Sequence, residues 1–208
     1  TKLEHNDFTG WEVQPSARSA WTPHERHTVW AAVSQAVRTP SRSERGFGLY
    51  INSPVPLPVF PVPILIRAMG HPDFGSEKML AYELGYRLKA HERLTLDAAA
   101  FYNQYDQLAS AALRPGEFHF EPEPYFLIPG TYENNLFGEG YGAEAMAVWR
   151  PHEAWRLRAG YGLLKLNLHT RGPIPSISEI MEQADPQQQA FVWSDVALGR
   201  PVEWGLGL

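Results

Sequence analysis

Residues 79–107 read MLAYELGYRLKAHERLTLDAAAFYNQYDQ. On both sides of the tetrapeptide at 90–93, alternate positions fall into an apolar set and a set that is mostly polar or small. The apolar set comprises Leu80, Tyr82, Leu84, Tyr86, Leu88, Leu94, Leu96, Ala98, Ala100 and Tyr102. A period of two residues is the period of a β-strand. The stretch therefore predicts two antiparallel strands joined by a tight turn, the second reaching about Gln107.

The same alternation recurs along the chain, and it predicts about nine strands in all. The expected strands cover residues 2–6, 13–21, 28–38, 79–89, 94–107, 141–149, 155–163, 192–198 and 202–208. Thr39-Pro40 should end the third of these, because proline cannot donate to a ladder of backbone hydrogen bonds.

Short and long connections alternate between these strands. The short ones lie at 22–26, 90–93, 150–154 and 199–201, and the long ones at about 39–76, 109–136 and 169–187. Long connections are uncommon inside compact soluble domains, whereas outer-membrane barrels have short periplasmic turns and long extracellular loops. The pattern predicts an all-β fold, a portion of an antiparallel up-and-down transmembrane β-barrel.

Tryptophans support this orientation. Four of them stand beside the short turns on the apolar face, where an interfacial girdle is expected. They are Trp21, Trp149, Trp155 and Trp204.

The opposite face carries charges interspersed with glycines. We expect these side chains to face a wet or plugged lumen, because unpaired charges in a small dry core would cost several kcal/mol each. They are Arg18, Glu83, Arg87, Asp97, Glu144, Arg156 and Arg158.

Composition excludes several classes of protein. The formal net charge is −5 and no Lys/Arg cluster is present, which argues against nucleic acid as a partner. The absence of cysteine excludes disulfides and thiol nucleophiles. The first residues lack an initiator Met and a signal peptide, and the last ones stop inside an alternating pattern. We therefore expect residues 1–208 to be one partial barrel domain of a longer protein.

Three motifs resemble those of one known family. Glu77, Glu83, Gly85 and Tyr86 match the pattern S-E-x-x-x-x-x-E-x-G-Y, and residues 101–106 match F-Y-N-x-Y-D. Residues 141–144 match Y-G-x-E. In order and over almost the whole chain, these segments resemble the TonB-dependent outer-membrane receptors. One departure is His71 before Pro72, where the family usually has Asn.

The resemblance implies a transport function without catalysis or a resident cofactor. Members of this family close about 22 strands around a plug domain, and this chain shows neither the plug nor the TonB box. The complete protein would sit in the bacterial outer membrane, in contact with lipid. It would bind a scarce nutrient, such as an iron-siderophore complex or cobalamin, and release it when the inner-membrane TonB complex acts on the plug.

Other interpretations remain open at this point. The chain could be a smaller self-contained outer-membrane pore or adhesin, or a soluble β-rich binding module whose apolar face packs on a second sheet. A hydrolase using Glu83, Asp97 and Glu144 is disfavoured, because no nucleophile elbow or metal-helix motif accompanies them.

The eight histidines suggest two further hypotheses. His24, His91 and His152 recur at equivalent turn positions, which favours a role in turn geometry over metal binding. His71, His119 and His169 occupy different long loops and could converge on a ligand, but we predict no metal site.

Two loop segments have local preferences of their own. Residues 54–63 are too proline-rich for the interior of a sheet and should be polyproline-like. Residues 176–184 have capping-box spacing and predict a short helix.

Overall fold

The computed structural model describes residues 1–46, 48–52, 62–172, 179, 186–197 and 203–207. These residues form strands almost throughout, with one short helix. The elements are β1 (Lys2–Asn6), β2 (Gly10–Gln14), β3 (Ser16–His24), β4 (His27–Arg38), α1 (Arg42–Gly46), β5 (Gly48–Asn52), β6 (Ile64–Met69), β7 (Glu77–His91), β8 (Leu94–Leu113), β9 (Glu117–His119), β10 (Tyr125–His152), β11 (Trp155–Thr170), β12 (Gln188–Ala197) and β13 (Glu203–Gly207). In the described part of the chain, no helix is long and apolar enough to span a membrane.

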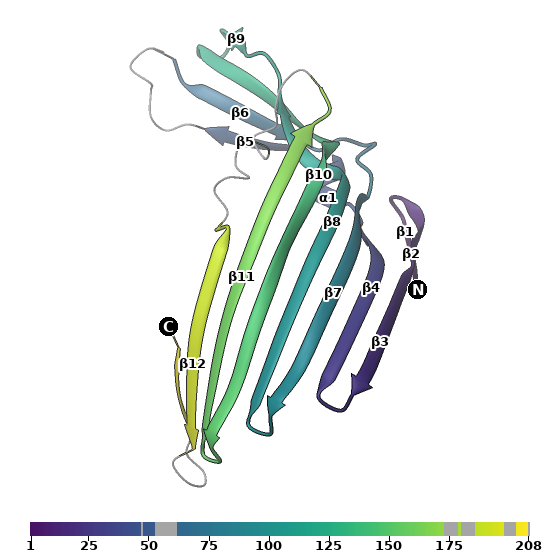
Figure 1. Ribbon diagram of the computed structural model, residues 1–208. Coiled ribbons are helices and arrows are strands. Elements are labelled where there is room, and N and C mark those ends of the chain that lie inside the picture. The colour runs from purple at the N-terminus through teal and green to yellow at the C-terminus, as the bar shows by residue number, and fades with distance from the viewer. Residues whose placement is uncertain (47, 53–61, 173–178, 180–185, 198–202, 208) are drawn as a thin grey trace.

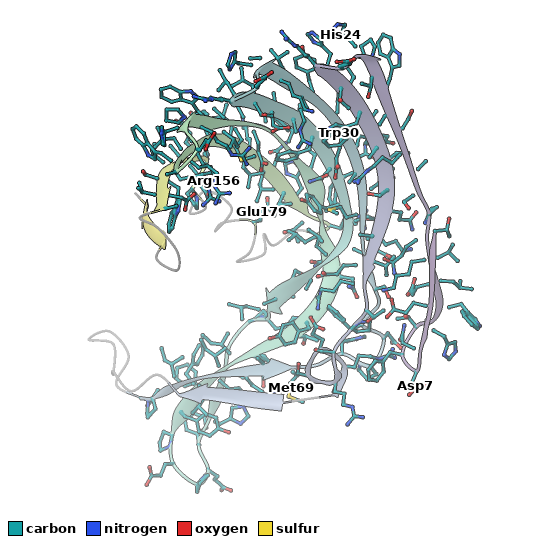
Figure 2. All side chains as sticks on the ribbon, turned by 90° about the horizontal axis from the view of Figure 1, so that it is seen from below. Asp7, His24, Trp30, Met69, Arg156 and Glu179 are labelled. Carbon is teal, nitrogen blue, oxygen red and sulfur yellow. The ribbon has the colours of Figure 1, made fainter. Side chains whose placement is uncertain are left out.

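One large antiparallel sheet forms the wall of the molecule. Its strands follow the order β13-β12-β11-β10-β8-β7-β4-β3, so each predicted hairpin pairs with the next (Figure 1). The sheet is strongly curved and open, with a concave and a convex face (Figure 2). β1 and β2 form a separate hairpin that leads into β3 across Pro15, whose carbonyl accepts a hydrogen bond from the Gln35 N–H at 2.9 Å. The predicted all-β antiparallel fold is confirmed.

The predicted long connections contain more structure than the sequence pattern indicated. β5, β6, α1 and β9 lie inside them, and β8 and β10 extend far beyond the predicted bounds of 94–107 and 141–149. The first half of β10 pairs in parallel with β6 and antiparallel with β9, forming an extension beyond the wall (Figure 1). The proline-rich segment lies mostly, and the predicted helix at 176–184 almost entirely, outside the described residues, as does the turn at 199–201.

Few apolar side chains are buried in the described residues. The buried ones are Phe74, Ala81, Leu127 and Leu136, and Phe74 meets the Tyr132 ring edge to face at 6.4 Å. In contrast, Leu84 is 57% exposed and Tyr161 is 46% exposed, both in the middle of the wall. No second sheet of the described residues covers this convex apolar face, so these residues do not form the core of a sandwich.

The three short turns within the described residues share one hydrogen-bonded unit. In each, a histidine Nδ1 accepts the backbone N–H two residues later, at 3.2–3.3 Å. The carbonyl of that second residue then accepts an N–H from the neighbouring hairpin at 2.8 Å. The histidines are His24, His91 and His152, and the second residues are Arg26, Arg93 and Ala154. The histidine thus satisfies one turn amide in each hairpin, as the turn hypothesis predicted.

Replacing His91 tests this unit. We expect His91→Leu to lower the free energy of unfolding by about 1 kcal/mol, because the Arg93 N–H loses its acceptor. His91→Asn should cost less, since its side-chain oxygen can accept the same bond. Denaturant unfolding in detergent micelles would measure both, with Glu92→Ala as the control. A His91→Leu protein as stable as the native chain would contradict the assignment.

Aromatic rings lie over glycines on the concave face of the wall. In each case the ring occupies the space that a side chain on the facing glycine would need. The pairs are Trp30 with Gly85, Phe101 with Gly142, Phe191 with Gly160 and Trp193 with Gly207. The rings therefore lie along the wall and cover backbone that would otherwise have no side chain over it.

Two glycines of neighbouring strands make a matched test. A Cβ on Gly142 would lie 2.1 Å from the Leu163 carbonyl oxygen, which cannot move without disturbing the ladder. A Cβ on Gly162 would meet nothing closer than the Glu144 Cγ at 3.8 Å. We expect Gly142→Ala to destabilise the fold by about 1–3 kcal/mol and Gly162→Ala to have little effect, measured by thermal unfolding. Equal midpoints for the two variants would refute the packing described here.

Candidate functional site

The cross-strand register places all seven predicted charged residues on one face of the wall. Arg87 pairs with Asp97, and Arg156 pairs with Asp195. The remaining members occupy the same face because directly paired residues share a face and alternate residues return to it. Figure 2 shows Arg156 on the concave side of the sheet. The structure therefore brings the predicted set together on the concave face.

Most of these charges are compensated by an opposite charge on the next strand or on the strand beyond it. The Arg87 Nε lies 2.5 Å from Asp97 Oδ1, and the closest approach of Arg18 and Glu83 is 3.9 Å. Such pairs on a wet surface contribute little stability, but they remove the cost of leaving a charge alone. They allow the concave face to be polar without a net charge along these strands.

Asp195 is a concave-face residue that the prediction did not include. Its carboxylate accepts from Arg156 Nε at 3.0 Å, from Arg158 Nη2 at 3.2 Å and from Trp193 Nε1 at 2.6 Å. In the sequence, only its alternation with the apolar residues of the strand at 192–198 indicated that it lies on the charged face. Two guanidinium groups share this single carboxylate, so the cluster carries an excess positive charge.

Glu144 has no ion pair or hydrogen bond to any described residue, in contrast to the other predicted concave-face charges. It lines a hollow of about 390 Å³ together with Trp30, Arg87, Asp97, Gln189 and Phe191. The hollow presents a free carboxylate, an ion pair, an amide and two aromatic rings. It can accept hydrogen bonds and oppose a positive charge.

The histidines of the long connections do not meet. The His119 ring stacks on Tyr125 at 4.9 Å, the His169 ring lies 5.8 Å from Phe137, and His71 Nδ1 accepts the Asp73 N–H at 3.2 Å. Within the described ranges, no group of three His, Cys, Asp or Glu side chains could hold a metal ion.

The convex face carries the predicted tryptophans at its short-turn end. Trp149 pairs with Leu157 and Leu94, and Trp21 pairs with Val29. Trp155 begins β11, two residues before Leu157, and its Nε1 donates to Ser194 Oγ at 3.0 Å. Their exposed fractions are 66% for Trp21, 48% for Trp149 and 39% for Trp155. Trp204 pairs in register with Val196, but its side chain lies outside the described part of the structure.

A row of tyrosines crosses the same convex face further along the strands. Tyr82 pairs with Tyr102, and Tyr102 pairs with Tyr141. The Tyr82 and Tyr102 rings are 6.4 Å apart. On the central strands β7, β8 and β10, the paired residues between this row and the tryptophans are alanine, leucine and tyrosine, and no charged side chain interrupts them.

The two faces of the wall differ: one has an apolar band bounded by aromatic residues, and the other has ion pairs. Comparison with protein families agrees with this arrangement. A family model described as "TonB dependent receptor-like, beta-barrel" matches residues 1–195 of the chain. The chain belongs to the TonB-dependent receptor family. No curated protein matches the chain at a significant level.

Solved structures of TonB-dependent receptors share the fold. The siderophore receptor PirA from Pseudomonas aeruginosa aligns with a TM-score of 0.69 at 15% identity, over 99% of this chain and 34% of that one. A variant of the ferric enterobactin receptor PfeA from the same organism, in complex with enterobactin, aligns at 0.69 and 15%, over 97% and 28%. The FrpB iron transporter from Neisseria meningitidis aligns at 0.57 and 15%, over 95% and 27%. The chain thus spans between about a quarter and a third of the length of these structures.

At the long-loop end, this receptor chain fixes α1 by a charged network. Arg38 donates to Glu77 and, through Nη2, to Glu44 at 2.7 Å. Glu44 also accepts from the Ser41 N–H at 2.7 Å and the Ser41 hydroxyl at 2.8 Å. Ser41 and Glu44 form a capping box at the start of the helix. Partial burial works to raise the pKa of Glu44, but the Arg38 and Ser41 hydrogen bonds outweigh it and hold that pKa below its ordinary value of 4.5.

The Glu44 network should weaken in acid. A carboxylate whose pKa is lowered by folding contributes stability above its unfolded pKa, and this contribution is lost as the pH falls through the folded value. We expect hydrogen exchange at residues 41–46, corrected for intrinsic rates, to accelerate in acid below the unfolded pKa. Glu44→Gln should remove most of this pH dependence, while Glu92→Gln, at an exposed turn, should not. An unchanged pH profile in Glu44→Gln would refute the role of the ionised carboxylate.

Proposed function

We propose that the chain forms part of the barrel wall of an energy-coupled receptor in the bacterial outer membrane. The complete protein takes up a scarce nutrient. The printed names of the structural relatives, a siderophore receptor, a ferric enterobactin receptor and an iron transporter, favour an iron-siderophore complex over cobalamin. A plug domain and the inner-membrane TonB complex are its proposed partners.

The segregation of the two faces carries this proposal. The convex face exposes large apolar side chains across neighbouring strands, and such an extended patch on a soluble monomer would be a liability. Lipid makes the same exposure favourable, because lipid tails are as apolar as these side chains. The outer-membrane bilayer is therefore the proposed environment of this face.

The aromatic rows set the proposed position in the membrane. Trp149 and Tyr141 are eight residues apart on β10, which is about 26 Å along a strand at about 3.3 Å per residue. A strand tilt of about 40° reduces this to a height of about 20 Å, close to the apolar band of outer-membrane barrels. The short turns then face the periplasm, and the extension of β5, β6 and β9 lies outside the cell.

The concave face is the proposed lumen wall. Its ion pairs and the free carboxylate of Glu144 suit contact with water, a plug or a passing ligand. Nothing in this arrangement requires catalysis, and we propose a transport role without enzymatic activity. A smaller self-contained barrel is less well supported, because β3 and β13 are the two edges of the sheet in the described residues. A soluble module is disfavoured by the uncovered convex face.

Spin labels at neighbouring positions test the proposal. This chain has no cysteine, so single labels are specific once any cysteine outside it is replaced by serine. In the full-length protein in lipid vesicles, labels at Leu84→Cys and Leu163→Cys should collide more with oxygen, which concentrates in lipid. Labels at the adjacent Glu83→Cys and Glu144→Cys should collide relatively more with a polar nickel complex. If the four positions showed the same ratio of the two collision rates, the membrane-wall proposal would fail.

A further inference from the structure

A shallow, open cavity of about 420 Å³ lies at the long-loop end, apart from the concave face. It is lined by Phe8, Arg42, Arg45, Gly46 and Pro72. These residues come from the turn between β1 and β2, from α1 and from the segment before β7. Two arginines and one phenylalanine therefore line a hollow where three distant parts of the chain come together.

Arg45 is held in place without the help of a carboxylate. Its Nη1 donates to the Phe8 carbonyl at 2.6 Å, its Nη2 donates to the Pro72 carbonyl, and its guanidinium carbon lies 5.3 Å from the centre of the Phe8 ring. Carbonyl partners fix the orientation of the group but leave its charge uncompensated. No carboxylate of the described residues forms an ion pair with Arg45.

Arg42 supplies a second cation on the same helical turn. It lies three residues before Arg45, a spacing that places side chains next to each other on a helix. Its side chain is exposed and has no hydrogen bond or ion pair to a described residue. Glu44 lies between the two arginines in sequence, but its carboxylate is engaged by Arg38 and Ser41 and does not neutralise them.

Exposed acids also lie near the cavity. Asp7 and Asp73 are the chain neighbours of Phe8 and Pro72, and neither lines the cavity. The surroundings are therefore of mixed charge, and broad attraction of anions is not expected. A ligand must enter between the two guanidinium groups to gain from both.

We propose that this cavity, the Arg42/Arg45 site, binds a phosphate or phosphomonoester group. Guanidinium groups present forked donors that match phosphate oxygens, and a doubly charged group can oppose both cations at once. The phosphate could be carried by a lipid headgroup or by a soluble molecule, and both present the same chemistry to the site.

Arg42→Gln is the informative change, because Arg42 holds no other part of the structure in place. In calorimetric titration of the full-length protein with inorganic phosphate, we expect about tenfold weaker binding than native, equivalent to losing a charged hydrogen-bonding group. Arg42→Lys should recover part of the loss. Arg150→Gln, which removes an exposed arginine at the opposite rim, should bind like the native protein, and acetate should compete poorly.

A second experiment, on lipid retention, distinguishes a lipid headgroup from a soluble molecule as the source of the phosphate. The native protein and Arg42→Gln are reconstituted into phosphatidylcholine vesicles with and without phosphatidic acid, and the lipid retained after re-extraction is measured. Preferential retention of phosphatidic acid by the native protein alone supports a headgroup ligand, whereas weakened phosphate binding without a lipid difference supports a soluble one. If Arg42→Gln matched the native protein in both experiments, with unchanged hydrogen exchange in α1, the site would be refuted.

Discussion

Backbone pairing along β10 is the constraint on which the rest of the structure depends. This strand of 28 residues is bonded to β8 and β11 along the wall, and to β6 and β9 in the extension. In hydrocarbon, an unpaired amide or carbonyl costs several kcal/mol, so a strand crossing a membrane must have a partner on each side. Beyond the wall the same strand continues with different partners, so the extension and the wall share one continuous strand.

The two faces follow from this pairing. Because side chains alternate while the backbone is fully bonded, a single strand can present alanine and leucine to lipid and charges to water. Ion pairs such as Arg87 with Asp97 and rings such as Trp30 over Gly85 form between neighbouring strands on the concave face. The register that satisfies the backbone therefore also brings each charge to its partner and each ring to its glycine.

The hairpin at 79–107 could be predicted because its signal is local: alternation and a short turn are both contained in about 30 residues. The pairing of β6 with β10 could not, because it joins segments about 60 residues apart, in parallel, without a connecting pattern. Trp30 is a large apolar residue at a position where the alternation calls for a polar or small one. The facing Gly85, which leaves room for its ring, explains why it is there. Asp195 carries no local signal of its two arginine partners, whereas the faces of the seven charged residues followed directly from parity.

The repeated histidine turn has a consequence for how such a wall can grow. Each of the three described short turns contains the same bonded unit and reaches the neighbouring hairpin through the same backbone hydrogen bond. Successive hairpins are consequently joined in the same way at this rim. Each turn offers the next hairpin the same backbone carbonyl as a hydrogen-bond acceptor. A chain that duplicates or deletes whole hairpins would change the circumference of the wall, always in steps of two strands. The hydrogen bonds that join one turn to the next hairpin would stay the same.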